Sequence, residues 1–338
     1  MPLKNLLYIG NKLSGKDINV TTIETLGASL THEGYSVFYA SEKRNPLLRM
    51  TDMLWMTFRL RKQTDYVLID TYSTSGFWFA FLVSQLCRVL NKHYIPILHG
   101  GNLPNRLQNN PTLCRMVFGH AYRNVAPSHY LLEAFRRFGF TNLVFIPNTI
   151  EIDRYPYLER KEFRPKLLWV RAFDQIYNPK MAVTVLNELQ KRYPDAQLCM
   201  VGPDRDGSME HCKDYALENK VTVRFTGRLP KEAWIALAAE YDIFINTTHF
   251  DNTPVSVMEA MALGLPVVTT NVGGIPFLLK DREEALLVDD GDGEGMVKAI
   301  CTLMENPVLT QRLVQNARRK AESWDWEVVK GLWADLFR

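Results

Sequence analysis

Cysteine is scarce in this sequence, and its few copies are scattered. The five cysteines are an odd number without any CxxC spacing, at Cys87, Cys114, Cys199, Cys212 and Cys301. This pattern excludes a disulfide framework and a zinc site built on paired cysteines, and it fits the reducing cytoplasm. The glycine-containing loop IGNKLSGKDIN at 9–19 lacks the G-x-G-x-x-G spacing, so a nicotinamide-binding fingerprint is absent as well.

Long apolar runs are also missing. The longest, GFWFAFLVSQLC at 76–87, is shorter than the roughly 18 residues that a membrane span needs, so we interpret it as a core helix. The N-terminus, MPLKNLLYIGNK, lacks the apolar core and cleavage site of a signal peptide and favours a buried strand, so we expect no export. With 46% hydrophobic and 23% charged residues and no low-complexity tract, the chain should fold throughout.

Charge is unevenly distributed along the chain. Residues 1–150 hold 16 Lys and Arg against 8 Asp and Glu, and residues 151–338 hold 24 against 29. A positive first half suggests anionic lipids, an anionic acceptor or nucleic acid as a partner. The segment LLRMTDMLWMTFRLRK at 47–62 mixes apolar and basic residues as an interfacial helix does, although a helix packed on its own domain explains it equally well. Nucleic acid ranks low because no binding motif is present.

Strand and helix patterns alternate along the whole chain, which at 338 residues fits two domains. Expected strands of the first domain lie at 6–9, 36–39, 66–69, 94–98, 124–126 and 143–146. Those of the second lie at 167–170, 197–201, 221–225, 242–246, 266–269 and 286–288. We predict two doubly wound, Rossmann-like α/β domains, 1–150 and 151–322, with the ligand cleft between them. A C-terminal helix at 323–338 should pack across the boundary.

The segment DNTPVSVMEAMALGLPVV at 251–268 places two carboxylates around the start of a buried helix. Thr253 suits the N-cap and Pro254 the first turn, so we predict a helix over about 254–263. Its free amides form an anion site that follows Asp251, and Glu259 lies about 7 Å further along the axis at roughly 1.5 Å per residue. Taken alone, each carboxylate is better explained as a helix cap or a solvated side chain than as a ligand-binding group. Together they suit a nucleotide sugar, which carries hydroxyls on both sides of a diphosphate.

The stretch DNTPVSVMEAMALGLPVVTTNVGGIP at 251–276 resembles the donor-binding segment of retaining glycosyltransferases of family 4. That family has a GT-B fold of two Rossmann-like domains facing across a cleft. It usually has Glu where this chain has Asp251. The resemblance implies that Asp251 holds the sugar and Glu259 the ribose, and that Asn252, Thr253, Pro254 and Val255 line the donor site.

Other segments match the family in order. In LLWVRAFDQIYNPKMAV at 167–183, the resemblance assigns the diphosphate to Arg171, with Lys180 reaching from a longer loop because Ile176 stands where the family has Lys. In VRFTGRLPKEAW at 223–234, Gly227 and Arg228 would bind the base. In the first domain, the resemblance assigns site residues at Gly15 in the first loop and at His99 after a strand. Arg106, Ser128 and His249 are weaker candidates.

The resemblance therefore implies a retaining glycosyltransferase without metal or cofactor. It would move a sugar from a nucleotide-sugar donor to a glycan or lipid-linked acceptor in cell-surface polysaccharide synthesis. Domain closure would assemble the site. We expect a cytoplasmic protein, peripheral at the inner face of the membrane. Two alternatives stay open, a nucleotide-sugar epimerase of similar fold and a non-catalytic member that only binds nucleotide or glycan.

Overall fold

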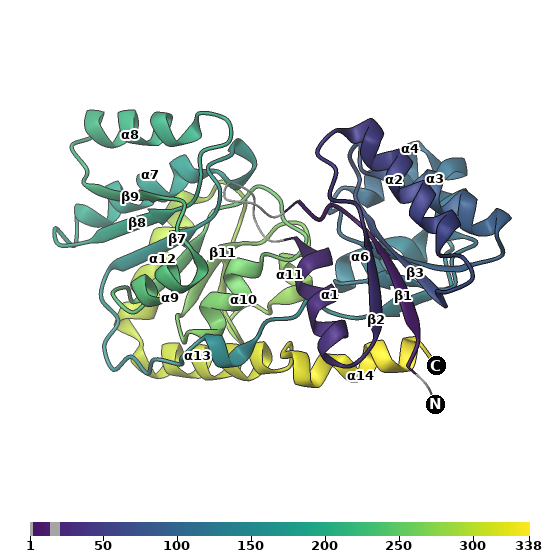
Figure 1. Ribbon diagram of the computed structural model, residues 1–338. Helices are drawn as coiled ribbons and strands as arrows, with labels where there is room; N and C mark the ends of the chain where they lie inside the picture. The colour runs from purple at the N-terminus through teal and green to yellow at the C-terminus, as the bar shows by residue number, and fades with distance from the viewer. Residues whose placement is uncertain (1–2, 14–20) are drawn as a thin grey trace. The chain divides into compact units, whose positions relative to one another are not determined.

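Two compact units make up the computed structural model, which describes residues 3–13 and 21–338. The first unit comprises Met1–Pro147 together with Lys330–Arg338, and the second comprises Asn148–Val329. Each unit contains a six-stranded parallel sheet with helices on its faces (Figure 1). The predicted α/β class with two doubly wound sheets is confirmed.

The first sheet has the strand order β2-β1-β3-β4-β5-β6. Its strands are β1 (Asn5–Ile9), β2 (Ser36–Ala40), β3 (Tyr66–Thr71), β4 (His93–Leu98), β5 (Asn124–Ala126) and β6 (Leu143–Phe145). The central strand β3 is buried at every position because helices cover both faces of a parallel sheet. The strand order reverses between β1 and β3, which is the point where open α/β sheets bind ligands.

The helices of the first unit are α1 (Thr22–His32), α2 (Pro46–Arg59), α3 (Phe77–Val89), α4 (Leu103–Asn109), α5 (Pro111–Phe118) and α6 (His129–Arg137). Helix α2 begins where Asn45 Oδ1 accepts hydrogen bonds from the amides of Leu47 and Leu48, at 2.9 and 3.2 Å. The apolar run at 76–87 forms α3, whose Ala80, Val83 and Cys87 pack into the core. Among the described helices, none combines the length and apolar character of a membrane span.

The second sheet has the order β12-β11-β10-β7-β8-β9. Its strands are β7 (Lys166–Val170), β8 (Gln197–Val201), β9 (Val223–Gly227), β10 (Ile243–Asn246), β11 (Val267–Thr270) and β12 (Leu286–Val288). Here the order reverses between β7 and β10. Strand β9 begins two residues later than predicted. Lys220 adopts the left-handed conformation and the Val221 amide bonds the carbonyl of Ala216, so Val221 closes a helix instead of opening the strand.

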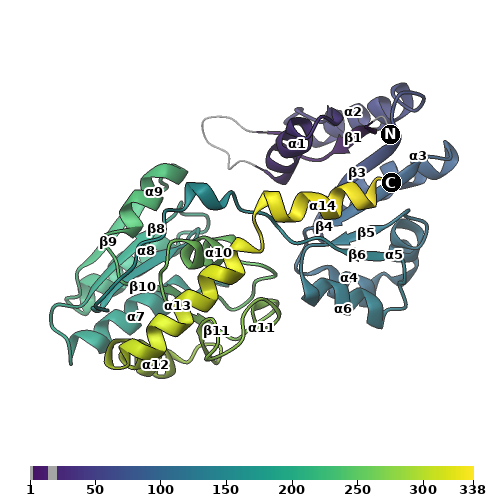
Figure 2. The same ribbon diagram turned by 90° about the horizontal axis from the view of Figure 1, so that it is seen from below.

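Two apolar cores flank this second sheet. Helices α7 (Pro179–Gln190), α8 (Ser208–Glu218) and α12 (Gly293–Glu305) pack on one face, and α9 (Lys231–Ala238) and α10 (Val255–Ala262) pack on the other (Figure 1). Helix α13 (Pro307–Glu322) lies along α10 (Figure 2), and the short α11 (Ile275–Leu278) follows β11. Helix α10 is buried at every position after Val255, which explains its apolar sequence.

Helix α14 (Trp326–Leu336) begins in the second unit, and its residues from Lys330 onward belong to the first. The ring of Phe337 packs against Tyr35 and Tyr66 of the first unit, with centroids 5.3 and 5.6 Å apart. Lys330 Nζ lies 3.5 Å from Glu33 Oε1. The aromatic residues at the end of the chain are therefore core residues of the first unit.

Candidate functional site

The strands on either side of the second sheet's reversal point bring Arg171 and Asp251 together. Arg171 directly follows β7 and Asp251 lies in the loop after β10, and their side chains form an ion pair. The Arg171 guanidinium also lies over the Tyr177 ring, 4.2 Å from its centroid. Burial lowers the pKa of Arg171. Tyr177 and Glu259 oppose this effect and raise the pKa. A cation and a carboxylate thus share the position where ligands of such sheets bind.

Helix α10 starts one residue later than predicted. Its first residue is Val255, and Pro254, with ψ of 103°, occupies the N-cap position that the sequence had suggested for Thr253. Thr253 Oγ1 and Ser256 Oγ are buried without a hydrogen-bond partner among the described residues, as is Arg171 Nε. The first amides of an α-helix have no intrahelical acceptor and attract anions. Buried hydroxyls, a guanidinium N–H and helix amides are together a donor set that suits a phosphate group.

The loop before α10 is held by a glycine. The Gly274 amide donates to the Asp251 carbonyl at 2.7 Å, and a Cβ at position 274 would lie only 1.8 Å from the Asn252 carbonyl oxygen. Only glycine allows this close approach of the two backbones. The GG pair at 273–274 therefore fixes the backbone that carries Asp251.

Glu259 is buried on α10, and two side chains engage its Oε1. The Tyr155 hydroxyl donates to it at 2.8 Å, and the Lys231 ammonium forms an ion pair with it. Burial and the Glu259 carboxylate raise the pKa of Tyr155, so this hydroxyl stays protonated as a donor. Neither partner was predicted. The one signal for Lys231 is its place four residues after Gly227, in the segment assigned to the base.

Three other predicted residues are Lys180, His249 and Arg228. The Lys180 ammonium lies over the Tyr215 ring of α8, 4.9 Å from its centroid. His249 Nδ1 lies 2.7 Å from Asp290 Oδ1 in a partly exposed pair. Arg228 is exposed in the loop after β9.

Gly227 ends β9 with a positive φ of 67°, and its carbonyl accepts a hydrogen bond from the Gly202 amide at 2.9 Å. This bond fixes the start of the loop to which the resemblance assigns the base.

In the first unit, His99 is bound to an unpredicted carboxylate. His99 Nε2 lies 2.8 Å from Asp70 Oδ1, and the Tyr8 hydroxyl donates to the same oxygen at 3.0 Å. The second oxygen of Asp70 is buried without a hydrogen-bond partner among the described residues and lies against Gly10, where a Cβ would be 2.6 Å from it. Asp70 is the second-to-last residue of β3 and Gly10 follows β1, so this group marks the reversal point of the first sheet.

The remaining candidates of the first unit have structural partners or no description. Ser128 Oγ caps α6 by accepting from the Leu131 amide at 3.2 Å. Arg106 Nε donates to the Ser73 carbonyl at 2.9 Å, and its guanidinium lies over the Phe77 ring. Gly15 lies outside the described residues.

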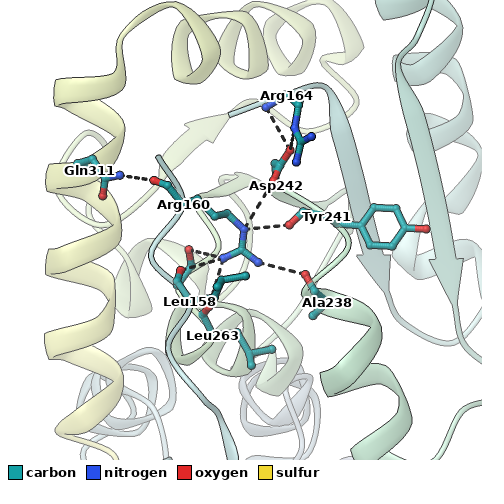
Figure 3. Close-up of polar contacts among 9 residues, drawn as sticks. Leu158, Arg160, Arg164, Ala238, Tyr241, Asp242, Leu263 and Gln311 are labelled. Carbon is teal, nitrogen blue, oxygen red and sulfur yellow. Dashed lines mark hydrogen bonds and ion pairs between the residues drawn. The ribbon is translucent and has the colours of Figure 1, made fainter. Parts of the chain in front are cut away.

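A buried arginine anchors the far end of α10. The Arg160 guanidinium lies near Asp242, at 3.9 Å, and donates to a set of backbone carbonyls (Figure 3). These carbonyls, at 2.9–3.3 Å, belong to Tyr241, Leu158, Leu263, Gly264 and Ala238. Some of these carbonyls lie at the C-terminal ends of α9 and α10, where the helix dipole favours a cation. Arg160 thus fixes together the two helices that carry Lys231 and Glu259.

A known protein family matches the part of the chain that contains these residues. Residues 156–320, which contain the Arg171, Asp251 and Glu259 group, match the model of glycosyl transferases group 1. This segment belongs to that family. The chain is 26% identical to a glycogen synthase of Mycobacterium tuberculosis over 208 residues. The matched residues make up 59% of this chain and 49% of the relative. The chain spans about half the length of curated relatives such as this one and a phosphatidyl-myo-inositol mannosyltransferase of Mycobacterium leprae.

Solved structures resemble the group 1 glycosyltransferase chain over nearly its whole length. The match to a sucrose-phosphate synthase from Thermosynechococcus elongatus covers 99% of this chain and 98% of the synthase chain, with a TM-score of 0.80 and 16% identity. HepE from Anabaena, solved in complex with UDP-glucose, covers 98% of both chains with a TM-score of 0.76 and 15% identity. The fold class predicted from the sequence, GT-B with two Rossmann-like domains, is confirmed.

Proposed function

We propose that this protein is a retaining glycosyltransferase that transfers a sugar from a nucleotide-sugar donor to a glycan or lipid-linked acceptor in cell-surface polysaccharide synthesis. The observation that carries the proposal is the Arg171–Asp251 ion pair at the start of α10, with Glu259 buried one turn further along the helix. The diphosphate would lie at the α10 N-terminus. Asp251 would accept a hydrogen bond from a sugar hydroxyl, and Glu259 from the ribose.

These side chains support breakage of the bond between sugar and diphosphate. As that bond lengthens, the sugar gains positive charge and the diphosphate gains negative charge. The Arg171 guanidinium and the α10 amides oppose the negative charge in a site that is already organised before reaction. In the retaining course, the acceptor hydroxyl attacks the anomeric carbon of the sugar from the face that the diphosphate leaves. The hydroxyl proton passes to the departing diphosphate. His99, oriented by Asp70, would contact the donor sugar.

Calorimetric titration with UDP, GDP and ADP tests the donor site. We expect one nucleotide to bind selectively, and Glu259→Ala to weaken that binding by about 10–100-fold because a carboxylate hydrogen bond to the ribose is lost. Glu305→Ala, at an exposed carboxylate paired with Arg192 in the turn after α7, is the matched control and should bind like the wild type.

Two results would contradict the proposal. A well-folded wild-type protein that binds none of the three nucleotides removes the donor site. Conversion of a nucleotide sugar without any acceptor, seen in product analysis, would identify an epimerase instead of a transferase.

The lipid-linked acceptor is supported by an exposed apolar and basic surface on the first unit. Helix α2 exposes Trp55 at 58%, next to Phe58 and the basic Arg59, and the Arg61 guanidinium lies over the Phe58 ring at 4.1 Å. Helix α3, which packs beside α2, exposes Trp78 at 47%. Aromatic rings beside arginines suit the headgroup region of an anionic bilayer. We therefore include peripheral contact with an anionic membrane in the proposal.

Replacing Trp55, Arg59 and Arg61 by Ala should lower binding to phosphatidylglycerol-containing vesicles by at least about tenfold, at roughly 1 kcal/mol per basic residue near the surface. Vesicle co-sedimentation measures this. An alanine triple variant of Phe138, Arg136 and Arg137 likewise removes one aromatic residue and two arginines at exposed positions of the same unit, and it should keep its binding. Equal binding by both triple variants would count against the membrane contact.

A further inference from the structure

Lys231 is held beside the donor site although it belongs to another helix. It is the first residue of α9, directly after Pro230, and its ammonium pairs with Glu259 Oε1 on α10. The side chain also lies over the Trp234 ring, 5.8 Å from its centroid. At 41% exposure it is much more accessible than Glu259, so the ammonium sits between the buried carboxylate and solvent.

The direction of the Glu259 side chain places this ammonium toward the start of α10. Side chains on a helix lean toward its N-terminus, so the Glu259 carboxylate reaches back toward Ser256, whose hydroxyl is buried and without a partner among the described residues. Glu259 and Arg171 are close enough for the carboxylate to raise the pKa of Arg171. Glu259 therefore connects Lys231, its ion-pair partner, with the part of the site that holds Arg171 and the α10 N-terminus.

Charge in this group is balanced before any donor binds. Arg171 is paired with Asp251, and Lys231 is paired with Glu259, so the four formal charges cancel. A diphosphate brings further negative charge, which needs a cation able to turn toward it. Arg171 is fixed by Asp251 and by the Tyr177 ring, whereas Lys231 has a flexible stem and an ammonium with three donors. Glu259 keeps the Tyr155 hydroxyl as a partner if Lys231 shifts.

We propose that Lys231 is a donor-binding residue whose ammonium binds the diphosphate of the nucleotide sugar, while Glu259 holds it next to the α10 N-terminus. This inference rests on the proposed function, since it assigns a further residue to the same donor site. Lys231 would add a mobile cation to the fixed cation Arg171.

The test separates the diphosphate from the ribose. The nucleoside diphosphate selected among UDP, GDP and ADP, its nucleoside, and inorganic pyrophosphate are each titrated into wild type and Lys231→Met. Methionine keeps an apolar stem over Trp234 and removes the charge. We expect the diphosphate and pyrophosphate to bind about tenfold more weakly to Lys231→Met, because a charge-assisted hydrogen bond is lost, and the nucleoside to bind equally. Lys231→Arg should restore diphosphate binding to within about threefold, as expected for a retained charge.

Lys213→Met on α8, where the lysine pairs with Glu210 at the surface, is the control and should bind as the wild type does. Thermal unfolding of each variant shows that it is folded. Equal weakening of nucleoside and diphosphate would mean that Lys231 acts only by neutralising Glu259, and unchanged binding would mean that it does not act at all. Either result overturns this inference and leaves the proposed function in place. A wild-type protein that binds no nucleotide overturns both.

Discussion

Arg171→Ala should lower kcat by about 10²–10³-fold, the usual cost of removing one preorganised donor from a developing negative charge. The guanidinium is held on Asp251 and over Tyr177, and its Nε is buried without a partner among the described residues. Because the diphosphate gains charge as it leaves, the lost interaction is stronger in the transition state than in the bound donor. Steady-state kinetics with the nucleotide sugar identified by titration measures kcat and KM separately.

The control for Arg171 is Arg192→Ala, which removes an exposed arginine paired with Glu305 on the same unit and should leave kcat unchanged. Arg171→Lys keeps the charge without the planar fork and should recover only part of the rate. A raised KM with unchanged kcat in Arg171→Ala would show that the residue only binds the ground state. That outcome would contradict a role in stabilising the leaving group.

Arg160→Ala should reduce the free energy of unfolding of the second unit by about 3–5 kcal/mol, as is typical when one partner of a buried ion pair is removed. Among the residues that the structure describes, the substitution leaves the buried carboxylate of Asp242 with Arg164 as its one ion-pair partner. It also removes donors from the carbonyls at the ends of α9 and α10 (Figure 3). Burial lowers the pKa of Arg160, and the nearby Asp242 carboxylate opposes this shift. Denaturant unfolding followed by far-UV circular dichroism measures the change.

Arg164→Ala is the matched comparison because Arg164 pairs with the same Asp242 at 2.9 Å from a side chain that is 57% exposed. Exposed ion pairs contribute about 0–1 kcal/mol, so this variant should unfold almost like the wild type. If both variants lost the same small amount, the carbonyl cluster would not depend on Arg160. The anchoring role of Arg160 at α9 and α10 would then be wrong.

The strands were predictable because each is a short β-branched or aromatic run between turn signals. All twelve exist, and the errors are at the ends, where hydrogen bonds decide the boundary. The Val221 amide closes α8, so β9 begins later than expected. Pro254 takes the N-cap position, so α10 also begins later than expected. Composition does not determine which carbonyl accepts the hydrogen bond of an individual amide.

The site was predictable where it follows strand ends and not where it depends on packing between distant elements. Arg171 and Asp251 meet because β7 and β10 are neighbours at the reversal point. The contact of Glu259 with Tyr155 joins residues 104 positions apart and depends on how helix α10 packs.

The same distinction holds for single side chains. His99 directly follows a predicted strand, but its Asp70 partner is 29 positions away and meets it because β3 and β4 are paired. The contact of Lys180 with Tyr215, which lies 35 positions further along the chain, likewise depends on how the start of α7 packs against α8.

The shared helix α14 has a consequence for synthesis on the ribosome. The aromatic ring that covers Tyr35 and Tyr66 is Phe337, which is translated after the whole second unit. At 5–20 residues per second, roughly 10–40 s separate the completion of the first sheet from the emergence of this ring. During that interval the nascent first unit exposes an aromatic surface, and a chaperone that binds such surfaces would find its substrate there.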